Sequence, residues 1–159
     1  MLFKEEQDLL YGIFILIILL DQFTKQVAVK YLKLGEPLIL IENFLSFTYV
    51  ENRGAAFGIL QNKKIFFLII TVAVIFFVVF FLKKNFYHLS KLMKVSLVML
   101  IAGAVGNLID RIRLGYVIDF ISVRFSNGYY FPVFNVADSF IVISTILIVI
   151  MVLFNKYEV

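Results

Sequence analysis

The sequence predicts an all-α polytopic membrane protein: a bundle of four transmembrane helices with a small β-rich extracytoplasmic loop region. Of 159 residues, 62% are hydrophobic and 16% are charged, and the mean hydropathy is +0.99, which is typical of membrane proteins. Four apolar segments are long enough to cross a bilayer, and basic residues cluster at their ends. We expect a single integral membrane domain over residues 1–159, with spans at about residues 9–32, 65–82, 92–112 and 136–154.

The composition also excludes several functions. The chain has no cysteine, which rules out disulfides, thiolate zinc sites and a cysteine nucleophile. Its single histidine, His88, lies in a predicted loop and cannot build a histidine-rich metal site. Because the net charge of +4 is concentrated at span ends, it indicates membrane orientation rather than nucleic-acid binding. We expect no metal, no cofactor and no nucleic-acid partner.

The first span is expected to stay in the mature protein as a helix. Lys4 is followed by acidic residues, so the chain lacks the basic start of a cleavable signal peptide. Asp21 and Lys25 lie one helical turn apart and can pair on one face. If Asp21 faces protein and Lys25 extends to the interface, the helix spans the membrane. A structural salt bridge is favoured over a catalytic role for Asp21.

The connection at about residues 33–62 has the pattern of short strands. Leu45, Phe47 and Tyr49 alternate with polar residues, and a short apolar run at residues 38–40 precedes them. Residues 51–58 are rich in small side chains, which allow close approach of a backbone to a neighbour or ligand. A plain turn leading into the second span would explain the same composition.

The loop between the second and third spans sets the orientation. Residues 83–94 include four lysines, and the positive-inside rule assigns such a loop to the cytoplasm. Both termini are then cytoplasmic. The loops at about residues 33–62 and 113–134 face outward.

The third span carries polar residues on one face. Asn107, Asp110 and Arg111 follow one another at helical spacing near its end. Ala102 and Gly106 form a small-residue ridge suited to close helix packing. Asp110 and Arg111 are explained either by a structural ion pair or cap, or by contact with a substrate.

A second strand-like region precedes the last span. Residues 117–125 favour a strand, Asn127-Gly128 predicts a two-residue hairpin turn, and aromatic residues 129–131 would form the return. Asn135 can cap the last helix, with Asp138 in its first turn.

Two aspartates lie at the same predicted outer rim. Asp119 and Asp138 could act as a pair in which one carboxyl group is protonated and the other accepts a proton from water. From spacing alone this is a weak signal, because a capping role would explain each residue.

Five motifs in chain order strengthen the pair hypothesis. The chain reads DQFTK at residues 21–25, NRGAAF at 52–57, GNLIDR at 106–111, VIDFI at 117–121 and FNVADS at 134–139. In these motifs, and in its length and four-span layout, it resembles the bacterial lipoprotein signal peptidases, the type II signal peptidases.

The resemblance implies an aspartic endopeptidase of the bacterial cytoplasmic (inner) membrane, with its active site at the outer face. Its substrates would be prolipoproteins, cut just before a diacylglyceryl-modified cysteine, and membrane lipids would surround it. Asp119 and Asp138 would be the catalytic pair. The residues implied to line or support the site are Asn52, Gly54, Asn107, Asp110, Arg111, Asn135, Ala137, Asp21 and Lys25.

Within this pair, the position of Asp138 near a helix N-terminus favours its ionised form and leaves Asp119 to carry the proton. Three other classes stay open. They are a small transporter or channel using membrane carboxylates, a noncatalytic membrane scaffold, and a serine–lysine hydrolase using Ser122, Ser126 or Ser139.

Overall fold

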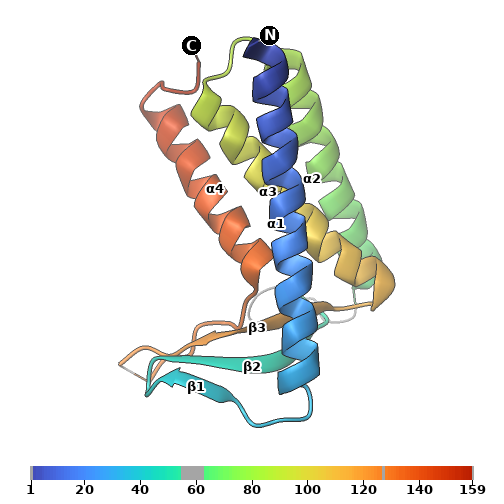
Figure 1. Ribbon diagram of the computed structural model, residues 1–159, viewed down its shortest axis with the longest axis vertical. Helices are drawn as coiled ribbons and strands as arrows, with labels where there is room; N and C mark the ends of the chain where they lie inside the picture. Colours follow the sequence, from blue (N-terminus) through green and yellow to red (C-terminus); the bar gives the residue numbers. More distant parts are fainter. Residues whose placement is uncertain (1, 55–62, 127, 159) are drawn as a thin grey trace.

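The computed structural model describes residues 2–54, 63–126 and 128–158, which form four helices and a three-stranded sheet (Figure 1). The start of α1 and the end of α4 lie at one end of the bundle, here called the terminal end (Figure 1). The sheet lies at the other end, here called the sheet end. The helices are α1 Leu2–Leu32, α2 Lys64–Asn85, α3 Lys91–Arg113 and α4 Val136–Leu153. The strands are β1 Leu38–Ile41, β2 Leu45–Asn52 and β3 Val117–Val123.

All four helices are long and apolar enough to span a membrane. They contain 31, 22, 23 and 18 residues, which corresponds to lengths of about 27–46 Å. The hydrocarbon core of a bilayer is about 30 Å thick. Each helix coincides with a predicted span to within a few residues, except that α1 starts earlier, at Leu2. One ion pair holds this early start, because Glu6 of α1 lies 2.7 Å from Lys94 of α3.

Helix α3 is the centre of the bundle, and small residues let α4 pack closely against it. Ala102 is fully buried. A Cβ atom placed on Gly103 would lie 2.6 Å from the carbonyl oxygen of Ala137 at the start of α4. From the predicted ridge, Gly106 also lies against α4, because a Cβ atom on it would lie 3.3 Å from the Ala137 Cβ; Gly103, which was not part of that ridge, makes the closer approach. By contrast, α2 has no buried residue among those described, and most of its large apolar side chains are exposed, although Val78 and Leu82 pack against the core.

The sheet joins the two predicted β-rich loops. β1 and β2 form an antiparallel pair within the first loop, as the alternation of residues predicts. β2 also pairs antiparallel with β3 of the second loop, from Leu45 opposite Val123 to Asn52 opposite Val117. The sequence analysis did not anticipate this pairing. It carries Asn52 to the same edge as Asp119, which pairs with Val50.

The predicted hairpin after β3 is wrong in detail. The chain does return, because Arg124 bridges Tyr130 and the Phe131 amide donates to the Val123 carbonyl. The return forms no named strand, however, and the Phe125 amide bonds to the Tyr129 carbonyl across a longer turn than the expected two residues. The returning segment continues along β3 to Phe134, which bonds to Phe120 and Ile121, but a one-residue shift in register between Tyr130 and Phe134 interrupts the regular pairing. Asn127 lies outside the described residues, as do residues 55–58 of the predicted close-approach segment.

Candidate active site

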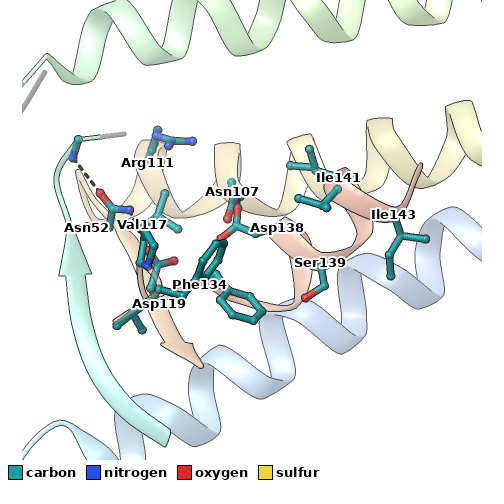
Figure 2. Close-up of a pocket in the computed structure, with 15 residues that line it drawn as sticks. Asn52, Asn107, Arg111, Val117, Asp119, Phe134, Asp138, Ser139, Ile141 and Ile143 are labelled. Carbon is teal, nitrogen blue, oxygen red and sulfur yellow. Dashed lines mark hydrogen bonds between the residues drawn. The ribbon is translucent and has the colours of Figure 1, made fainter. Parts of the chain in front are cut away.

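Four elements bring the candidate pair and its partners together at the sheet end. β2 ends at Asn52, α3 contributes Asn107 from its last two turns, β3 carries Asp119, and α4 begins with Asn135 as its cap and Asp138 in its first turn. Figure 2 shows Asn52, Asn107, Asp119 and Asp138 around one space. The polar residues that the sequence distributes over a long stretch therefore form one cluster.

Asp119 is almost fully buried and is held by two side-chain amides. The Asn52 Nδ2 group donates to Oδ2 over 2.8 Å, and the Asn135 Nδ2 group donates to Oδ1 over 2.7 Å. Burial raises the pKa of Asp119 to about 7, and repulsion from Asp138 adds to the rise. Asp119 is therefore a carboxyl group that can hold a proton near neutral pH.

Asp138 is fixed by the start of α4. Its Oδ2 atom accepts the Asn135 backbone N–H at 3.1 Å, and the Asn135 side chain accepts the Asp138 N–H at 2.9 Å, which completes a capping box. The Oδ1 atom accepts from Asn107 Nδ2 at 2.7 Å. The predicted cap is confirmed. Backbone N–H groups at a helix start favour a negative charge there.

Two amide side chains connect the two aspartates. Asn135 Nδ2 donates to Asn107 Oδ1 over 3.1 Å as well as to Asp119. Because the oxygen of Asn107 accepts in this network, its nitrogen faces Asp138. Asn107 and Asn135 thus form a continuous hydrogen-bonded path from one carboxyl group to the other.

A second cluster is centred on Lys25 and is joined to the pair through Asn107. The Nζ atom lies 2.9 Å from Asp21 Oδ2, from Asp110 Oδ2 and from Asn107 Oδ1, so its three N–H donors all have acceptors. The predicted pair of Asp21 and Lys25 is confirmed. The expectation that Lys25 extends to the membrane interface is wrong, because these acceptors draw it inward until it is 1% exposed.

The Lys25 cluster ties four elements together. Asp21 of α1 accepts the Ala137 N–H of α4 at 3.0 Å. Asp110 of α3 accepts the Ile118 N–H of β3 at 3.2 Å. The structural interpretation of Asp21 and Asp110 is therefore supported, although the partner of Asp110 is Lys25 and not its neighbour Arg111.

Gln22 belongs to this cluster and was missed as a site residue. Its Nε2 atom donates to Asp110 over 3.0 Å, to Asp21 over 3.2 Å and to the Gly106 carbonyl over 3.3 Å. Its place between Asp21 and Lys25 in the first motif was a usable signal. Gly106 is required here for space, since a Cβ atom would lie 2.6 Å from Asp21 Oδ2.

The pair opens into a cavity of about 570 Å³. Gly54 and Arg111 line it beside the polar cluster. The Gly54 N–H donates to Asn52 Oδ1, and the Arg111 guanidinium lies 5.3 Å from the ring centre of Phe67 on α2. The remaining walls are mostly apolar and come from the stretch before α4 and from α4 itself (Figure 2). The lining residues that the sequence analysis did not single out are Val117, Phe131, Pro132, Val133, Phe134, Ile141, Val142 and Ile143.

The third serine candidate also lines this cavity. The Ser139 hydroxyl donates to the Asn135 carbonyl within the first turn of α4. Lys25, the buried lysine nearest in the network, has its three donors engaged elsewhere. A pair of Ser139 with Lys25 therefore has no support from this geometry.

The fold and the site define a membrane-embedded protein with paired carboxyl groups beside an apolar cavity. The family described as "Signal peptidase (SPase) II" matches residues 13–154. The lipoprotein signal peptidase of Clostridium tetani is 45% identical over 141 residues, covering 89% of this chain and 90% of that protein. The lipoprotein signal peptidase of Caldanaerobacter subterraneus is 48% identical over 140 residues, covering 87% and 92%.

Two solved structures share this fold. One structure of a bacterial membrane enzyme superposes with a TM-score of 0.84 at 38% identity, covering 94% of this chain and 90% of that one. A second reaches 0.79 at 39% identity, covering 92% and 93%. The chain belongs to the signal peptidase II family.

Proposed function

We propose that this protein is a membrane aspartic endopeptidase that removes the signal peptide from bacterial prolipoproteins, cutting just before the diacylglyceryl-modified cysteine. The observation that carries the proposal is the pair of Asp119, which is buried, and Asp138, which is partly buried. The two are joined through two amides and open to a cavity with apolar walls. The names of the relatives give the substrate class.

In the proposed mechanism, ionised Asp138 takes a proton from a water molecule while protonated Asp119 donates its proton to the scissile carbonyl oxygen. The water oxygen bonds to the carbonyl carbon and gives a neutral diol. The diol returns a proton to Asp119, the C–N bond breaks, and Asp138 gives its proton to the leaving nitrogen. Both aspartates then have their starting charge, and one water has been consumed.

The assignment of the two roles rests on surroundings. Asp138 accepts a backbone N–H at the start of α4, which favours its negative charge. Asp119 lies in a strand with side-chain amides as partners, and burial raises its pKa to about 7. The pair titrates together, so a pH–rate profile reports the two groups jointly.

Supporting residues hold this geometry. Asn107 and Asn135 orient the carboxyl groups, Asn52 donates to Asp119, and Gly54 fixes the Asn52 side chain. Arg111 is a cation at the cavity wall and can bind a substrate carbonyl.

The remaining four supporting residues contact the elements that carry the pair and do not contact either carboxyl group. Asp21, Lys25, Asp110 and Ala137 brace the elements that carry it. The apolar walls, including Ile141 to Ile143, would hold acyl chains and the end of the signal helix.

The proposed location is the bacterial cytoplasmic membrane, with both termini inside and the sheet end outside. The lysine-rich connection between α2 and α3 supports this orientation by the positive-inside rule. The site would then face the side on which the signal peptide of an exported protein ends.

The test compares cleavage of a diacylglyceryl-modified prolipoprotein by the wild-type protein, Asp119→Asn and Asp138→Asn in detergent. The wild type should cut before the modified cysteine. Each variant should bind substrate but cut at least about 10²-fold more slowly, because it lacks a general acid or base. Asp8→Asn, at an exposed position on α1, is the control and should cut normally. Near-normal turnover by either pair variant would contradict the proposal.

A further inference from the structure

A second cavity, of about 520 Å³, lies toward the terminal end of the bundle between α1 and α2, over α3. It shares no lining residue with the candidate active site. We call it the α1–α2 groove. Its lining residues are Gln7, Leu10, Tyr11, Phe14, Ile75, Val79, Leu82, Lys83, Phe86, Tyr87, Val98, Ile101 and Val105.

The deep part of the groove is apolar and elongated. Val98 and Ile101 of α3 form its floor, and Phe14 of α1 and Val79 of α2 belong to its walls. From Ile75 to Lys83 the α2 wall runs for about 12 Å at the rise of an α-helix. Because its walls are membrane-spanning helices, an apolar chain is the natural occupant.

The end of the groove nearest the terminal end is polar and basic. Of the described residues that line the groove, only Lys83 is charged. Gln7 of α1 lies at the same end. Glu6, the neighbour of Gln7, is already paired with Lys94. Tyr11 also lines this end and is 67% exposed, as suits an aromatic residue at a membrane–water interface.

We propose that the α1–α2 groove binds an anionic membrane phospholipid, with an acyl chain between α1 and α2 and the phosphate at Lys83 and Gln7. Basic pockets between transmembrane helices on the cytoplasmic side bind anionic lipid headgroups. A signal helix is the other apolar candidate, but its basic start would meet Lys83 with the same sign of charge. The bound chain would fill the space between α1 and α2 and brace α2, which has no buried residue among those described.

The experiment measures binding of phosphatidylglycerol and of phosphatidylcholine with the same chains to the purified full-length protein, by native mass spectrometry and by thermal unfolding. Wild-type protein should retain phosphatidylglycerol selectively and unfold at a higher temperature with it. Lys83→Gln should weaken this binding about five- to tenfold, as expected for the loss of one basic group near an anionic lipid. Lys84→Gln, the neighbouring lysine outside the lining, should change it less than about twofold.

A second pair of variants tests the apolar part of the groove. Val79→Trp should fill the groove and abolish the site, whereas Val74→Trp, on an exposed part of α2, should not. Both variants should cleave substrate normally if folded, because neither residue lines the candidate active site. Equal losses for Lys83→Gln and Lys84→Gln, equal binding of the two lipids, or displacement of the lipid by a free signal peptide would each overturn the proposal.

Discussion

Two pairs of aspartates lie at the sheet end, and they differ in their partners; Asp21, Asp110 and Asp119 are buried, and Asp138 is partly buried. Asp21 and Asp110 each lie 2.9 Å from the Lys25 ammonium and accept a backbone N–H from a neighbouring element. In the described part of the chain, Asp119 and Asp138 have no salt bridge and are held by amides.

This difference in partners indicates a structural role for Asp21 and Asp110 and a catalytic role for Asp119 and Asp138. A carboxylate that is paired with a buried cation stays ionised and is costly to disturb. A buried carboxyl group held by neutral amides can change its protonation state, as the raised pKa of Asp119 shows. Asn107 joins the two clusters, because it accepts from Lys25 and donates to Asp138.

The largest expected effect on folding is that of Lys25→Met. The substitution would leave Asp21 and Asp110 without a cation in a buried site, which typically costs about 3–5 kcal/mol. Thermal or denaturant unfolding in detergent measures this loss. Lys33→Met is the control, because Lys33 pairs with Glu51 at an exposed position, and its effect should stay within about 1 kcal/mol. Equal effects would mean that the cation is not what holds the first cluster.

Asn107→Leu should remove the hydrogen bonds that connect the Lys25 cluster to Asp138. It removes a hydrogen bond to a charged group, worth about 1.5–3 kcal/mol, so cleavage should fall by roughly 10- to 100-fold. The assay is prolipoprotein cleavage at saturating substrate. Asn85→Leu is the control and should cleave normally, because Asn85 lies at the end of α2, where its side chain bonds to the Phe81 carbonyl, and it does not line the candidate active site. Unchanged cleavage by Asn107→Leu would exclude the amide path from the mechanism.

Gly106→Ala tests the packing around Asp21. The new Cβ atom would lie 2.6 Å from Asp21 Oδ2 and 3.3 Å from the Ala137 Cβ, and such overpacking costs about 1–3 kcal/mol. Gly12→Ala is a matched control on α1, because nothing lies within 4 Å of its Cβ position. It should leave the unfolding temperature unchanged or raise it slightly. Equal behaviour of the two variants would show that α1 and α3 are not tightly apposed.

A pH dependence of stability is also expected from Asp119. The unfolded chain loses this proton near the ordinary pKa of 3.8, and the folded protein keeps it until about pH 7. The free energy of unfolding should therefore fall as pH rises through this window. Asp119→Asn cannot titrate, so its stability should fall less between pH 4 and 7. Parallel curves for the variant and the wild type would contradict the raised pKa.

The sequence predicted features that local signals encode. The four helices follow from apolar runs and the capping box from Asn135 and Asp138, whose positions three residues apart are a local pattern. The pairing of Asp21 with Lys25 follows from helical spacing.

Features set by distant partners were not predicted. Lys25 turns inward because it bonds to Asn107 and Asp110. Both lie more than 80 residues away in sequence, so the hydropathy pattern around Lys25 carries no information about them. The pairing of β2 with β3 and the role of Gln22 also depend on contacts between separate elements. The location of Asp119 and Asp138 at one rim followed from the predicted spans, whereas the resemblance in five motifs strengthened the hypothesis that they act as a pair.

The most direct measurement compares Asp→Asn variants at all four of these positions, recording cleavage and thermal unfolding in the same detergent. Asp119→Asn and Asp138→Asn should lose cleavage and stay folded. Asp21→Asn and Asp110→Asn should lose stability, because each weakens the Lys25 cluster. Retained cleavage in Asp119→Asn or Asp138→Asn, or a loss of stability that accounts for their inactivity, would contradict the division of the four aspartates into a structural pair and a catalytic pair.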